Sequence, residues 1–158
     1  MRRTLALSLF ATALLTGVAA AAAPIARAET HVPCNTLPPA VFSQGKTEAG
    51  DATIRGCVKD KENGKVTYEV ETLKDGKSRD IVLDSSGSVL EVEQEVTASS
   101  VPEPVSDAIA KAAQGGKVGK IESVTRGGTI ASYETTITNK GRRSEVAFSP
   151  EGAPVKAD

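Results

Sequence analysis

Hydrophobic and polar residues alternate along most of the chain beyond residue 50, which is the pattern of half-buried β-strands. Glycine-containing turns such as Asp75-Gly76 and Gly127-Gly128 separate the alternating segments, as expected for antiparallel hairpins. The predicted strands lie near residues 52–59, 66–73, 78–83, 88–96, 117–126, 130–138, 142–148 and 153–157.

Two helices are expected, one before each group of strands. In the second half, apolar residues recur at the spacing of one helical face: Val105, Ala108, Ile109 and Ala112. Ser99 or Ser100 is predicted to cap this helix. In the first half, the predicted helix near 38–44 is short, because Gly45 and Gly50 interrupt the segment.

Comparison of the chain with itself indicates an internal repeat. An offset of 65 residues matches Tyr68-Glu69 with Tyr133-Glu134, Gly76 with Gly141, and Gly87 with Gly152. The sequence therefore predicts an α+β fold of two tandem repeats, each a helix packed on an antiparallel β-meander of three to four strands. The predicted units are residues 29–96 and 101–158.

Residues 1–28 have the features of a signal peptide. Arg2 and Arg3 precede a long apolar run, and Ala26-Arg27-Ala28 forms a cleavage site. The alternative is a transmembrane anchor, but an alanine-rich run is a weak membrane span. The protein is therefore expected to be periplasmic or secreted. Removing three arginines from the 19 Lys and Arg leaves 16 basic against 20 acidic residues, a net charge of −4.

The inventory of reactive side chains is small, with one histidine, two cysteines and 3% aromatic residues. It does not supply the ligands of a four-cysteine, two-cysteine-two-histidine or three-histidine zinc site. A Ser-His-Asp triad would have to use His31. We therefore predict a protein that is not an enzyme, that needs no cofactor, and that binds no nucleic acid, because its charges are nearly balanced.

Several segments resemble the PepSY-like domain family, which is described as β-lactamase-inhibitor-like. The similar segments are Gly-Lys-Val-Thr-Tyr-Glu-Val at 64–70, Lys-Asp-Gly-Lys at 74–77 and Ile-Val-Leu-Asp-Ser-Ser-Gly-Ser-Val-Leu at 81–90. The second half carries counterparts at 133–134, 139–142 and 150–152. The resemblance implies a bacterial, exported protein with two units of helix-packed antiparallel sheet. The inhibitor for which the family is named binds its enzyme with a concave sheet.

Strand alternation predicts an acidic sheet face in the first half. Tyr68, Val70 and Ile81 belong to the face under the helix. Six carboxylates fall on the opposite face: Glu69, Glu71, Asp80, Glu91, Glu93 and Glu95. This face could dock a basic partner, could hold divalent cations loosely, or could be an ordinary solvated surface.

Cys34 and Cys57 are predicted to form a disulfide, because an exported chain with an even number of cysteines favours pairing. The alternative is a redox pair or a pair of metal thiolates. No Cys-x-x-Cys spacing is present to favour that alternative.

His31 allows a metal-site hypothesis. If cleavage follows Ala28, the histidine is the third residue of the mature chain, and its imidazole, the terminal amine and two amides could enclose Cu²⁺ or Ni²⁺ in a square plane. The alternative is a histidine on a frayed tail.

Together these features predict an exported, non-catalytic binding module of the cell envelope. Its expected partner is an envelope protein or peptide, and a peptidase or hydrolase that it inhibits is one form of this expectation. A basic partner would suit the acidic face. The alternative functions are a periplasmic divalent-metal-binding protein and, least favoured, a hydrolase.

Overall fold

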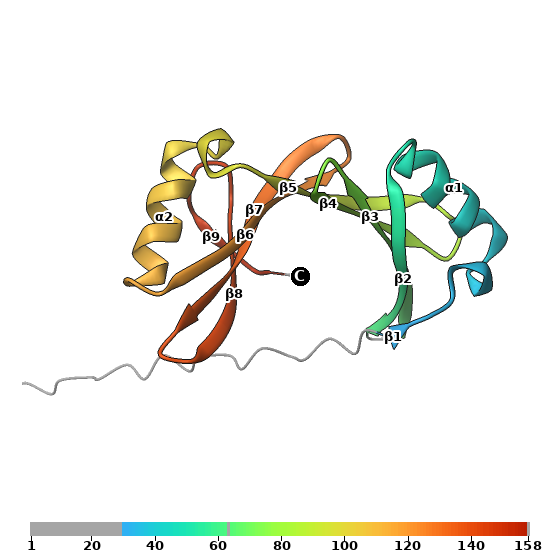
Figure 1. Ribbon diagram of the computed structural model, residues 1–158, viewed down its shortest axis with the longest axis horizontal. Coiled ribbons are helices and arrows are strands. Elements are labelled where there is room, and N and C mark those ends of the chain that lie inside the picture. The colour runs from blue at the N-terminus through green and yellow to red at the C-terminus, as the bar shows by residue number, and fades with distance from the viewer. Residues whose placement is uncertain (1–29, 63, 158) are drawn as a thin grey trace, which may run out of the picture.

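The computed structural model describes residues 30–62 and 64–157 of the chain (Figure 1). The predicted signal peptide, 1–28, lies outside the described residues. The helices are α1 (Pro39–Ala49) and α2 (Glu103–Ala113), with 3₁₀ turns at Cys34–Thr36 and Ala98–Ser100. The strands are β1 (Thr30–His31), β2 (Thr53–Glu62), β3 (Lys65–Lys74), β4 (Lys77–Asp84), β5 (Val89–Val96), β6 (Lys117–Arg126), β7 (Thr129–Asn139), β8 (Arg142–Phe148) and β9 (Pro154–Val155).

All strands belong to one antiparallel sheet of nine strands, arranged in chain order. The predicted fold of two tandem helix-and-meander repeats is therefore wrong. The finding that overturns it is the pairing of β5 with β6, which runs from Val92 opposite Thr125 to Val96 opposite Ile121. Two separate meanders would each expose an additional strand edge, and this pairing satisfies the backbone groups of both edges.

Both helices pack on the same face of the sheet, one near each end. On α1, Val41 is buried against Val70 and Ile81, and on α2, Val105 and Ile109 are buried in a second cluster with Tyr133. Figure 1 shows the sheet curved into an arch, with α1 and α2 on its outer side. The face away from the helices is therefore concave, and no helix of the described residues covers it.

The first helix is longer than predicted. α1 has 11 residues and continues through Gly45, which is buried. A Cβ atom at this position would lie 2.6 Å from Cγ2 of Val70. Gly45 is thus needed for the close approach of helix and sheet, and it does not end the helix.

The predicted serine cap of the second helix is also wrong. Ser99 and Ser100 lie in a 3₁₀ turn, while Pro102 is the N-cap residue of α2 and no side chain caps the helix. The strand predictions are confirmed to within a few residues, except that the last strand contains only Pro154–Val155 and that β1 was not predicted.

The predicted disulfide is confirmed. Cys34 and Cys57 are joined with a Cα–Cα distance of 5.2 Å. The bond ties the segment before α1 to β2; Cys57 belongs to the first core cluster, and Cys34 packs against that cluster. Among residues 30–62 and 64–157, no helix is long and apolar enough to cross a membrane.

Candidate functional site

The strand register brings together the six acidic residues that the alternation predicted to share a face. In a β-ladder, residues directly opposite each other point to the same side of the sheet. Glu71 lies opposite Asp80 on the neighbouring strand, and Asp80 lies opposite Glu93. Glu69 and Glu91 both lie opposite Val82, and Glu95 follows Glu93 on β5. These side chains lie on the concave face, because their strand neighbours Val70 and Ile81 pack under α1.

Two further carboxylates, from the second half of the chain, extend this set. Glu95 lies opposite Glu122, and Glu122 lies opposite Glu134. Sequence reasoning missed both residues, although alternation within 117–126 and 130–138 was a usable signal. We call the resulting set of eight carboxylates the acidic face. Its members are Glu69, Glu71, Asp80, Glu91, Glu93, Glu95, Glu122 and Glu134.

The acidic face contains two rows in which three carboxylates stand side by side on adjacent strands: Glu71–Asp80–Glu93 and Glu95–Glu122–Glu134. Directly opposed residues have Cβ atoms about 4.5–5.5 Å apart, and like charges at that distance destabilise a sheet. At ~5 Å and an effective dielectric constant of ~20, one pair of full charges repels by about 3 kcal/mol. Wherever two neighbours in a row are both ionised, the arrangement is therefore costly for the isolated protein.

Two bases on β6 neutralise part of this charge. Nε of Arg126 donates to Oε2 of Glu91 at 2.8 Å, and Nζ of Lys120 lies 3.2 Å from Oε2 of Glu95. Glu91 is only 7% exposed, so its ion pair offsets a large desolvation cost.

Polar neighbours hold other members of the acidic face in place. The Ser78 hydroxyl donates to Glu122 at 3.0 Å, and the amide of Thr72 donates to Asp80 at 3.2 Å. Ser132 donates to Glu134, which is 7% exposed, at 3.0 Å. These bonds orient the carboxylates without supplying a positive charge.

Among the members of the acidic face, Glu93 has the most strongly raised pKa. Burial raises its pKa to about 9, and repulsion by neighbouring carboxylates, of which Glu69 and Glu91 contribute most, adds to the shift. No ion pair reaches Glu93 within the part of the chain that the structure describes. Its carboxyl group is therefore protonated at neutral pH.

Other acidic groups of the face shift according to their surroundings. Burial raises the pKa of Asp80 to about 6, although the hydrogen bond from Thr72 opposes the shift. Burial also raises the pKa of Glu134. In contrast, the hydrogen bond from the Ser78 amide, assisted by Lys120, lowers the pKa of Glu95. The face thus combines ionised and protonated carboxyl groups at neutral pH.

His31, the predicted metal ligand, lies on β1 at one edge of the sheet. Its Nδ1 atom is 3.8 Å from Oε2 of Glu71, and its side chain is 73% exposed. Residues 30–62 and 64–157 contain no group of three histidine, cysteine or acidic side chains placed to hold a metal ion. The terminal amine in the copper hypothesis belongs to Glu29, outside the described residues, so that hypothesis stays a prediction.

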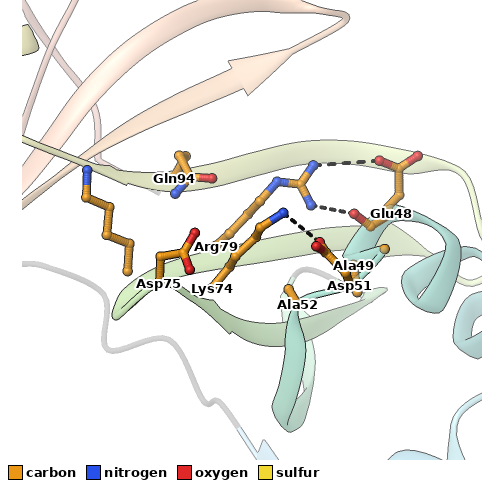
Figure 2. Close-up of a pocket in the computed structure, with 10 residues that line it drawn as sticks. Glu48, Ala49, Asp51, Ala52, Lys74, Asp75, Arg79 and Gln94 are labelled. Carbon is orange, nitrogen blue, oxygen red and sulfur yellow. Dashed lines mark hydrogen bonds and ion pairs between the residues drawn. The ribbon is translucent and has the colours of Figure 1, made fainter.

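An open pocket at the end of α1 differs from the acidic face, because two of its bases are paired with two of its acids. Figure 2 shows Lys74 directed at Asp51, and the Arg79 guanidinium directed at both the carbonyl and the carboxylate group of Glu48. Nζ of Lys74 lies 2.6 Å from Oδ1 of Asp51. The guanidinium donates to the Glu48 carbonyl at 2.7 Å. These paired groups link the end of α1 to the β3–β4 hairpin. The remaining charged residues of the lining, Asp75 and Lys77, have opposite signs, so the pocket as a whole carries no net charge.

No protein-family model matches the sequence, and no curated protein matches it. Several solved structures do match the fold. A proposed periplasmic protein of Bacteroides eggerthii is 15% identical, with a TM-score of 0.62 over 76% of this chain and 86% of that chain. A BLIP-like protein of Bacteroides fragilis is 18% identical, with a TM-score of 0.56 over 79% and 85% of the two chains.

A protein of the DUF2874 family from Bacteroides uniformis is also similar, at 19% identity and a TM-score of 0.59 over 75% of this chain and 86% of that chain. These similarities show that the chain has a BLIP-like fold. At such low identities they establish the fold alone.

Proposed function

We propose that this protein is an exported, non-catalytic binding module that holds a basic protein segment of the bacterial cell envelope on its acidic face. The observation that carries the proposal is the pair of three-carboxylate rows across the concave side of the sheet. A surface that serves only solubility would disperse exposed charges of both signs. Here carboxylates are partly buried side by side, and a partner's lysines and arginines would relieve their repulsion.

Two observations support export and binding. The Cys34–Cys57 disulfide is of a kind that persists in oxidising compartments such as the periplasm. Similar folds occur in the proposed periplasmic protein of Bacteroides eggerthii and in the BLIP-like protein of Bacteroides fragilis. Membership of the PepSY-like family, and inhibition of a hydrolase or peptidase by the concave face, are the narrower forms of this proposal.

The first test is calorimetric titration with acetylated deca-arginine amide, a cationic probe whose charge does not change with pH. The test variant is Glu71→Gln/Glu122→Gln on the acidic face. The matched control is Glu103→Gln/Asp107→Asn, which removes the same charge from α2 on the opposite face. We expect at least about fivefold weaker binding for the test variant and less than about twofold for the control.

Equal weakening by the two variants would mean that the probe responds to net charge alone, and would overturn the proposal for this face. If the difference is observed, the same three proteins serve as baits in envelope extract. A partner captured by the wild type and by the control, but not by the test variant, would then be identified by mass spectrometry.

A further inference from the structure

Glu93 lies at the centre of the acidic face, between strands that carry carboxylates on both sides. The acids that face it or flank it are Glu69 and Glu71 on β3, Asp80 on β4, Glu91 and Glu95 on β5, Glu122 on β6 and Glu134 on β7. Asp60 on β2, His31 on β1, and Arg143 and Glu145 on β8 lie farther out on the same side of the sheet.

The two bases of β6 that lie beside Glu93 are already engaged with other acids. Lys120 contacts Glu95 and Arg126 contacts Glu91, so neither forms an ion pair with Glu93. Across the ladder, one neighbour of Glu93 is the carboxylate of Asp80 and the other is the apolar side chain of Val124. A negative charge on Glu93 would therefore be both partly desolvated and surrounded by like charges.

We propose that Glu93 carries a proton at neutral pH and releases it to the surrounding solvent when a cationic partner docks, so that binding to the acidic face is linked to pH. This inference rests on the proposed function and specifies how the same face is regulated. In the isolated protein, the carboxyl group of Glu93 at the centre of the binding surface is neutral. In the complex it is ionised.

The size of the effect follows from the environment of Glu93. A positive charge within about 4–6 Å lowers the pKa of a carboxyl group by roughly 1–3 units. Docking would then bring the pKa of Glu93 from about 9 to roughly 6–8. At pH 8 the free protein holds this proton about nine-tenths of the time, and binding would release roughly 0.4 to 0.9 proton.

The same linkage strengthens binding as the pH rises. Each unit by which docking lowers the pKa of Glu93 increases the affinity about tenfold across the titration range. At pH 8 Asp80 is already ionised, because its pKa is raised only to about 6. Measurements at pH 8 thus exclude Asp80, and the Glu93→Gln variant distinguishes Glu93 from Glu134, whose pKa is also raised by burial.

The test is calorimetric titration of acetylated deca-arginine amide at pH 8 in buffers that differ in their enthalpy of ionisation. The slope of the observed enthalpy against the buffer ionisation enthalpy gives the number of protons released. Because arginine stays charged throughout, the probe itself contributes no protons. The wild type is compared with Glu93→Gln, which mimics the neutral form, and with the control Asp107→Asn on α2.

We expect roughly 0.4 to 0.9 proton from the wild type and from the control, and close to none from Glu93→Gln. Binding without proton release would overturn the linkage while leaving the proposed function intact. Equal release from Glu93→Gln would overturn the assignment to Glu93. Absence of binding at pH 8 would overturn both the linkage and the proposed function.

Discussion

Replacement of Glu93 by glutamine should stabilise the protein at neutral and alkaline pH. The carboxyl group has a pKa of about 9 in the folded chain, compared with an ordinary value of 4.5. The folded state therefore binds this proton more tightly than the unfolded state does, and the free energy of unfolding decreases as pH rises from about 4.5 to about 9. Glutamine has nearly the same shape and no charge, so it removes this dependence.

The magnitude follows from the distance between the two pKa values. Each pH unit in this window costs about 1.4 kcal/mol of stability. At pH 7 the accumulated cost is about 3 kcal/mol, which corresponds to a rise in Tm on the order of 10 °C for the variant. The advantage should be small at pH 5 and larger at pH 8.

Urea unfolding followed by circular dichroism at pH 5, 7 and 8 would measure the effect. Asp107→Asn, at an exposed position of α2, is the control and should follow the wild-type pH dependence. If Glu93→Gln were less stable than the wild type at pH 8, or if the difference did not grow with pH, the electrostatic account of the acidic face would be wrong.

Three further predictions concern the scaffold and its edge. Replacing Cys34 and Cys57 with alanine should lower the free energy of unfolding by about 3 kcal/mol, because the bond closes a loop with a sequence separation of 23. Chemical denaturation measures this loss, and an unchanged free energy of unfolding would contradict the prediction. Gly45→Ala should destabilise the fold by about 1–3 kcal/mol, despite alanine's higher helix propensity, because the new Cβ would clash with Val70; a higher Tm would refute this. Copper titration of mature protein should lose its visible absorption band in His31→Ala, and an identical band in both proteins would exclude the histidine as a ligand.

Local patterns in the sequence were sufficient to predict most of the strands and the second helix. The alternation of Tyr68, Glu69, Val70 and Glu71 determines which side chains share a face, because successive residues of a strand point to opposite sides. The same period placed the six acidic residues of the first half together before their strand partners were known. The disulfide was also predictable, since the chain offers only one pair of cysteines.

The tertiary structure decided how the two halves of the chain combine. Nothing in the local pattern shows that β5 pairs with β6, because this pairing joins strands that are separated in sequence by α2. It replaces two open edges with one continuous ladder, and it brings Glu95 opposite Glu122. The second row of carboxylates therefore exists only in the folded sheet.

Gly45 shows the same dependence on tertiary packing. From the sequence alone, glycine predicts a helix end, because it has the lowest helix propensity among residues other than proline. In the folded protein the absence of a side chain allows α1 to rest on Val70. Likewise, the alternation places Glu93 on a face but does not reveal the burial and the surrounding acids that raise its pKa, because desolvation and repulsion arise only when distant strands are brought side by side.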